Sequence, residues 1–178
     1  MSAPDGWLEE LERHRADKDE YFREHPQSPV PADQREGFEG LPYFDPDPDY
    51  RFEVEIHEHD TKEPITVATT TDGEREYVEW GEFDFVVDGT DCTLQVYSRD
   101  TDDDGFWLPF RDATSGEETY GAGRYLELDF EEDQTAEGWV LDFNLAYSPF
   151  CAYNDAYECP LVPVANWLER PIRAGEKY

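Results

Sequence analysis

The sequence predicts a mainly β protein, either an antiparallel β-sandwich or a partly open barrel, with an N-terminal helix and an irregular, wrapped C-terminal tail. Apolar and polar residues alternate through the middle of the chain, and short turn signals such as Asp88-Gly89 separate the alternating runs. The last third of the chain has no such period. Prolines punctuate it, and its many aromatic side chains need somewhere to be buried.

The first segment predicts one helix over residues 5–24, with Asp5 as its N-cap and Pro26 just beyond its end. Its apolar stripe is narrow, so we expect the helix either to pack across the end of a sheet or to dock loosely. A length of 178 residues favours one domain with a substantial core. We therefore divide the chain into a helix within 1–26 and a single β domain over 27–178.

Alternation and turn residues predict an antiparallel meander of short strands. The expected strands lie at 52–57, 65–70, 77–80, 83–87, 92–96, 106–110, 125–128 and 139–143. Gly81 is expected to separate the third strand from the fourth, and the last strand is expected to pair back with 125–128 across an acidic loop centred on Asp133. The acidic runs 100–104 and 131–137 are predicted to be solvated loops.

The charge balance indicates adaptation to high salt. The chain carries 14 Lys and Arg residues against 45 Asp and Glu residues, for a net charge of -31. In dilute buffer this self-repulsion destabilises a compact state, whereas at ~1 M salt the Debye length shrinks to about 3 Å. An acidic interaction protein is the alternative; a disordered chain is disfavoured because 38% of the residues are hydrophobic. Most carboxylates are therefore expected to be solvated surface groups.

The same composition disfavours several partners and locations. There is no basic stripe to displace counterions from nucleic acid or to bind an anionic membrane. No apolar run approaches the ~20 residues of a membrane span, and the polar N-terminus lacks a signal-peptide core. An odd set of three cysteines, Cys92, Cys151 and Cys159, argues against a disulfide framework. We therefore expect a cytoplasmic protein, whose oligomeric state the sequence leaves open.

The densest group of polar and glycine residues runs from position 110 to 125. Its glycines permit a close approach of the backbone, and Arg124 could bind a phosphate or carboxylate there. Internal pairing of Arg124 with Asp112 or Asp142 is the alternative, which we favour. Asp142 and Asn144 share a face of the last strand, and Asp142 with Asp112 could form an acid–base pair.

No metal site is predicted. Cys151 and Cys159 are separated by seven residues, more than the spacing of about two to four that zinc sites use. His57 and His59 share the solvent face of a strand with glutamates. Small packed thiols and exposed histidines explain these residues, and we expect no cofactor.

The motifs from Phe38 to the C-terminus resemble the domain of unknown function 1684 family. The resemblance covers residues 38–178 and rests on GLPYFDPDPDYRF, PFRDATSGEETYGAGRYLEL, LDFNLAYSPFCAY, YECPLVP and RAGEKY. Two positions depart from the pattern, Ala122 in place of glycine and Ser148 in place of asparagine. The family has no established activity, so the resemblance implies none.

Three functional hypotheses follow from this group of residues. The first is a binding site for a small anionic molecule, lined by Arg124, Asn144, Tyr120, Tyr153 and Asn166 together with the two aspartates. The second is a hydrolase or isomerase with Asp142 or Asp112 as acid or base, assisted by Tyr120 or Tyr153. The third is structural: the residues form a polar network that pins the tail to the sheet, with Asn166 and Glu176 as anchors.

The net charge predicts that stability depends on salt. We expect the midpoint of thermal unfolding to rise steadily from dilute buffer to molar KCl, because the added ions screen repulsion among the carboxylates. Circular dichroism melts over a KCl series measure this. A midpoint that is flat or falls with salt would contradict the interpretation of the acidic surface.

Overall fold

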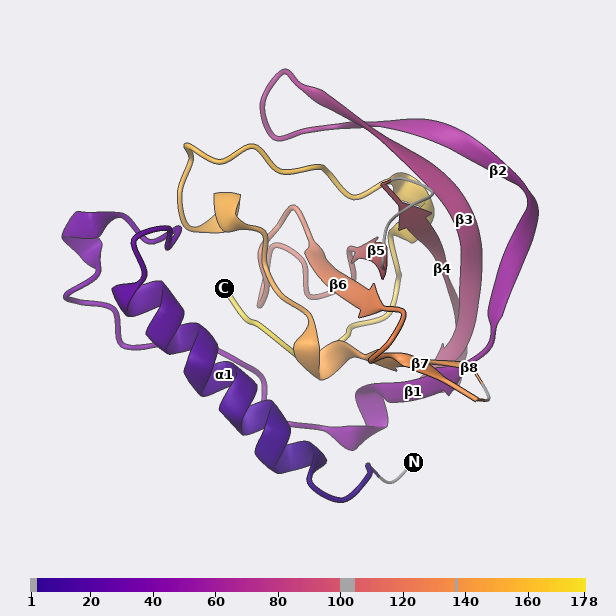
Figure 1. The fold of residues 1–178 in the computed structure, drawn as a ribbon, viewed down its shortest axis with the longest axis horizontal. Coiled ribbons are helices and arrows are strands. Elements are labelled where there is room, and N and C mark those ends of the chain that lie inside the picture. Colours follow the sequence, from indigo (N-terminus) through magenta and orange to yellow (C-terminus); the bar gives the residue numbers. More distant parts are fainter. Residues whose placement is uncertain (1–2, 100–104, 137) are drawn as a thin grey trace.

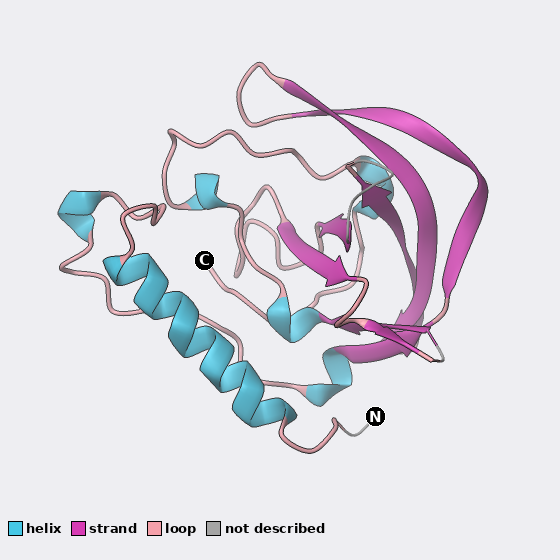
Figure 2. Cartoon of the chain, in the orientation of Figure 1, coloured by secondary structure: helices cyan, strands magenta, loops and turns pink. Residues whose placement is uncertain are grey.

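The computed structural model describes residues 3–99, 105–136 and 138–178, so the acidic run at 100–104 lies outside the described residues. One α-helix, α1 (Trp7–Glu24), precedes the strands (Figures 1 and 2). The strands are β1 (Arg51–Val54), β2 (Ile56–Ala68), β3 (Glu74–Val87), β4 (Thr90–Ser98), β5 (Gly105–Phe110), β6 (Arg124–Asp129), β7 (Gln134–Thr135) and β8 (Gly138–Asp142). None of the helices in these ranges combines the length and the apolar character that crossing a bilayer requires.

The strands form two antiparallel sheets, which confirms the predicted fold class. The larger sheet has the order β2-β3-β4-β5-β6 and the smaller one the order β1-β8-β7. Across the described ranges they do not close into a barrel. The long strands β2 and β3 curve along one side of the molecule, and α1 lies along the opposite side (Figure 1).

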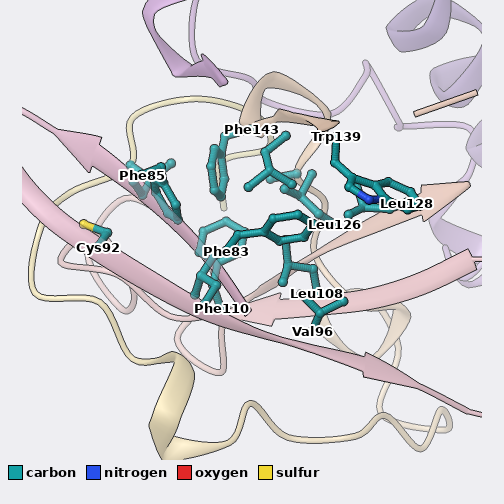
Figure 3. Close-up of a cluster of buried hydrophobic side chains, with 14 of the residues drawn as sticks. Phe83, Phe85, Cys92, Val96, Leu108, Phe110, Leu126, Leu128, Trp139 and Phe143 are labelled. Atoms are coloured by element: carbon teal, nitrogen blue, oxygen red, sulfur yellow. The ribbon is translucent and has the colours of Figure 1, made fainter. Parts of the chain in front are cut away.

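The main core lies between the two sheets and is rich in aromatic rings (Figure 3). Phe83 of β3 and Leu108 of β5 are both fully buried on the larger sheet, and Leu141 of β8 is fully buried on the smaller one. Phe143 packs edge-on against Phe110, with ring centroids 5.2 Å apart. Rings supply the buried apolar area that a chain with few large aliphatic residues needs.

The helix agrees with the prediction except at its start. Gly6, with φ of 82°, occupies the N-cap position and no side chain caps the helix, so the assignment of Asp5 was wrong. The next residue, Trp7, instead donates its indole N–H to Asp142 at 2.6 Å, so a tertiary contact holds this end. On the inner face Leu11 and Phe22 are buried, and Phe22 packs against rings of the tail.

Two predicted strand boundaries were wrong. The run 52–57 is not one strand, because the chain leaves the smaller sheet after Val54 and enters the larger one at Ile56. Gly81 does not end a strand but lies inside the long strand β3, where the register with β4 shifts. A Cβ atom at Gly81 would lie 2.8 Å from the carbonyl oxygen of His57, so the glycine permits a close approach of β2.

The pairing of the last strand was also predicted wrongly. β8 does not pair back onto β6; it lies between β1 and β7, while β6 pairs with β5. The tight turn after β6 is held by Asp133, whose N–H donates to the carbonyl oxygen of Asp129 at 2.9 Å. This turn directs the chain away from the larger sheet. Alternation shows which face of a strand is apolar but does not identify the neighbouring strand.

The tail beyond β8 is irregular, as predicted, and it contacts the larger sheet at several points along its length (Figure 2). Isolated bridges attach it at Thr69–Pro160, Tyr125–Tyr147 and Arg111–Trp167. Near its end, Gly175 has φ of 83°, and a Cβ atom there would lie 2.7 Å from the carbonyl oxygens of both Phe143 and Ala146. Only glycine fits this crossing without strain.

Gly175→Ala is therefore expected to lower the free energy of unfolding by about 2 kcal/mol or more, because the left-handed backbone and both carbonyl oxygens oppose a Cβ. Gly37→Ala is the control, since the nearest atom to its Cβ position is 3.9 Å away. Denaturant unfolding in molar KCl measures both. Equal stability of the two variants would contradict this explanation of Gly175.

Candidate functional site

Arg124 opens β6 and lies almost fully buried, at 1% exposure. Its guanidinium donates to the carbonyl oxygens of Ile172, Ala174 and Glu176, at 2.8 Å for Ile172 and 3.2 Å for Glu176. The ring of Phe110 lies below it, with the guanidinium carbon 5.0 Å from the centroid. Arg124 therefore binds the backbone of the C-terminal segment Ile172–Glu176.

Asp112 binds the same segment from the other side. Its Oδ2 accepts the N–H of Ile172 at 2.6 Å, and its Oδ1 lies 3.5 Å from Nη2 of Arg124. The hydroxyl of Thr114 donates to this carboxylate at 2.8 Å. Burial lowers the pKa of Arg124, and Asp112 opposes that effect through its charge and a hydrogen bond. The internal ion pair that we favoured from the sequence is present.

Asp142 and Asn144 form a second group at the end of β8. Oδ1 of Asp142 accepts the N–H and the side-chain N–H of Asn144, at 3.0 and 2.8 Å. The amide of Asn144 in turn exchanges hydrogen bonds with the backbone of Asp47, at 2.8 and 2.9 Å. The indole N–H of Trp7 donates to Oδ2 of Asp142. This group of residues therefore joins α1, the segment before β1 and the tail.

The remaining predicted residues also hold the tail. Asn166 exchanges hydrogen bonds with the backbone of Gln95 and donates to the carbonyl oxygen of Pro109, all within 2.9 Å. Tyr153 donates to Oε1 of Glu176 at 2.7 Å, and burial raises its pKa. Tyr120 lies 3.8 Å from Sγ of Cys151, and burial raises its pKa as well.

The loop after Phe110, the end of β8 and the tail thus converge, but the space between them is filled by the C-terminal segment. Every contact described above for Arg124 and Asp112 is with the chain itself, as the structural hypothesis expects. Their assignment as ligand-binding or acid–base residues stays a prediction. Asp142 differs in one respect, because it also borders a hollow beside α1.

That hollow adjoins a larger groove that we had not predicted. The groove has a volume of about 800 Å³, the hollow about 310 Å³, and both are bordered by His14, Glu132, Asp133 and Leu145. The groove runs along the outer edge of β6, with α1 as one wall. Tyr147 and Phe150 of the tail border it at the Arg124 end of β6.

The floor of the groove is an exposed sheet edge. Opposite Tyr125, β5 carries Pro109, which has no N–H, so the backbone groups of Tyr125 face away from β5. They pair instead with Tyr147, at 2.8 and 3.0 Å. Four residues on, Asp129 faces the same way and bonds to Asp133, at 2.7 and 2.9 Å.

Glu127 lies midway between these two positions, so its backbone N–H and C=O also face the groove. Among the described residues neither group has a hydrogen-bond partner. The path of the chain after β8 explains why no described residue pairs with Glu127. If the pairing of Tyr125 with Tyr147 continued, Leu145 would lie opposite Glu127, but residues Phe143–Leu145 form a 3-10 turn instead.

The groove is acidic, although cations also border it. The carboxylates on it are Glu127, Asp129, Glu132 and Asp133, and the basic residues are His14, Lys18 and Arg99. Lys18 is already paired with Glu176 and lies over the ring of Tyr147. Burial raises the pKa of Asp133, while burial and then Lys18 lower the pKa of His14.

The described part of the chain, the groove included, holds no cluster of metal-ligating residues. Within the described ranges no group of three or more His, Cys, Asp or Glu side chains could hold a metal ion. Cys92, Cys151 and Cys159 are buried and free, and the N–H of Cys151 donates to Sγ of Cys159 at 3.4 Å. The groove itself escaped prediction because it joins α1 to a strand edge, and sequence periodicity reports neither contact.

The fold and its groove define a two-sheet antiparallel β protein with a helix along one sheet edge. The chain belongs to the family described as protein of unknown function DUF1684, whose model matches residues 36–177. It is similar to the solution NMR structure of the uncharacterized protein from gene locus rrnAC0354 of Haloarcula marismortui. The two share 43% identity with a TM-score of 0.75, over 98% of this chain and 95% of that one. No curated protein matches the chain.

Arg124→Met is expected to lower the free energy of unfolding by about 3–5 kcal/mol, because it leaves Asp112 and three carbonyl oxygens without their buried partner. Arg173→Met is the matched control: its ion pair with Glu118, at 3.1 Å, is exposed and its loss should cost at most about 1 kcal/mol. Urea unfolding of both variants in molar KCl tests this. An Arg124 variant as stable as the control would remove the structural role of the network.

Proposed function

We propose that this protein binds a small molecule in the groove between α1 and the edge of β6. One observation supports the proposal above the others: at Glu127 the groove offers a backbone N–H and C=O that no described residue pairs with, beside aromatic and apolar side chains. A volume of about 800 Å³ lies within the range typical of ligand sites. The groups that a ligand would use are in place before it arrives.

The lining favours a ligand with a positive charge over the anion that we expected from the sequence. Four carboxylates face three basic residues, and Lys18 is already neutralised by Glu176. An amine could lie between these carboxylates and the ring of Tyr147, where cation–π attraction adds to the charge attraction. An anion would be repelled by the carboxylates on the same surface, and even high salt screens this repulsion only in part.

Acid–base chemistry in the same groove is the second candidate. Asp133 and His14 border both the groove and the adjoining hollow. Burial raises the pKa of Asp133 and lowers the pKa of His14, so the two values approach each other, as suits a pair that passes a proton through a substrate. This candidate keeps the reaction class of the sequence hypothesis, a hydrolase or isomerase, but assigns it to different residues.

We further infer that the protein works in the cytoplasm of a cell with high internal salt, without nucleic acid or membrane as a partner. The net charge of -31 supports this inference. Free buried thiols are also consistent with a reducing compartment.

Filling the groove should abolish binding. Leu145→Trp places a larger side chain at a position that borders both the groove and the hollow. We expect it to lower the affinity for any ligand found by the screen by at least about tenfold. Leu161→Trp is the control, because the two leucines are equally exposed, at 38% and 37%, and Leu161 does not border the groove. Thermal-shift screening in molar KCl, with separate panels of small amines, zwitterions and anions, supplies the hits.

Three outcomes of that screen would contradict the proposal. No stabilisation by any panel, equal effects of the two tryptophan variants, or hits that are lost only in Arg124→Met would each remove the groove as the binding site. Hits confined to the anion panel would keep the groove and overturn the charge preference.

A further inference from the structure

We propose that the ligand of this groove is a short, extended peptide in which a basic residue follows an apolar one, and that the peptide adds to β6 opposite Glu127. The inference rests on the proposed function and names the class of molecule that the same site would take. Adding a strand to an open sheet edge is a general mode of peptide recognition, in which backbone hydrogen bonds supply affinity and side chains supply specificity.

The length of the open edge sets the length of the peptide. Tyr147 occupies the edge at Tyr125, and Asp133 occupies it at Asp129. These positions are four residues apart, which at ~3.3 Å per residue leaves about 13 Å between them. Of this length, the position opposite Leu126 is taken by Ala146, the neighbour of Tyr147 in the chain, so about two extended residues fit. Because the backbone of the chain closes both ends, a short peptide suits the gap better than a strand of a folded partner.

The hydrogen-bonding register sets the central contact. One residue of an antiparallel peptide can exchange both of its backbone hydrogen bonds with Glu127, donating its N–H to the carbonyl oxygen and accepting the N–H. The preceding residue of the peptide then lies opposite Leu128, while Ala146 lies beside Leu126. Tyr147 makes the same pair of hydrogen bonds with Tyr125, two residues away on the same edge.

Side-chain direction sets the sequence of the peptide. Residues that lie opposite each other on paired strands point to the same face. The side chain of the peptide residue that pairs with Glu127 therefore lies beside the carboxylate of Glu127. That carboxylate is exposed, and of its oxygens Oε1 accepts the hydroxyl of Tyr147 at 2.7 Å. The side chain of the preceding residue points to the face of Leu126 and Leu128, both of which are buried in the main core. The pattern apolar–basic follows.

The carboxylates around Glu127 also favour a basic peptide residue opposite it. Asp129, Glu132 and Asp133 border the same groove beyond Glu127, at the end away from Lys18. A lysine or arginine opposite Glu127 would therefore face several carboxylates, whereas a glutamate there would be repelled by all of them. Capping both ends of the peptide removes terminal charges that would obscure this comparison.

The test uses N-acetyl-Leu-Lys-amide as the probe and the whole chain labelled with ¹⁵N, titrated in molar KCl. Two control peptides accompany it: one with glutamate in place of lysine, and one with a methyl group on the backbone nitrogen of lysine. We expect the probe to shift the amide resonances of β6, and each control peptide to bind at least about fivefold more weakly.

Two variants of the protein isolate the backbone bond. Glu127→Pro and Glu127→Ala both lose the carboxylate, but only the proline variant loses the N–H that faces the groove. Proline is tolerated there because this N–H is not part of the pairing with β5. We expect the proline variant to bind the probe at least about fivefold more weakly than the alanine variant.

The failures are distinguishable. If small molecules bind in the groove but the probe does not, or if the methylated peptide binds as well as the probe, the peptide inference falls and the proposed function stands. Equal binding to the two Glu127 variants overturns it in the same way. If the proline variant does not fold, the methylated peptide decides. If neither the screen nor the probe gives binding in the groove, both proposals fall.

Discussion

The buried guanidinium of Arg124 is the constraint on which the rest of this structure depends. A charge at 1% exposure is tolerated only when its hydrogen bonds and its counter-charge are supplied, and here three carbonyl oxygens and Asp112 supply them. The carbonyl oxygens belong to the C-terminal segment, which must therefore lie against β6. Once that segment is in place, Gly175 crosses the turn after β8, and the side chain of Glu176 reaches Tyr153 and Lys18.

Much of the fold follows from local sequence patterns. Alternation at Phe83–Val87 and at 92–96 located β3 and β4, and the proline-punctuated aromatic segment after β8 indicated an ordered tail. Sheet membership did not follow. Nothing local indicates that Val54 and Ile56 belong to different sheets, or that β8 avoids β6, because these facts depend on which strands meet in space.

The site was predictable only in part, for the same reason. Arg124, Asp112, Asn144 and Asn166 stood out because polar residues cluster among glycines and rings, and the structure does bring their segments together. What fills the space between them is Ile172–Glu176, a segment whose backbone rather than side chains makes the contacts. The groove depends on an unpaired edge at Glu127, and an absent hydrogen bond leaves no signal in a sequence.

The carbonyl partners of Arg124 lie 48 to 52 positions further along the chain. This separation has a consequence for cooperativity. If the final segment lifted away one residue at a time, a positive charge would be stranded among Phe110 and its apolar neighbours before water could reach it. Fraying of this tail is therefore opposed as soon as it reaches Glu176, and release of the segment and the opening of β6 should occur as a single event.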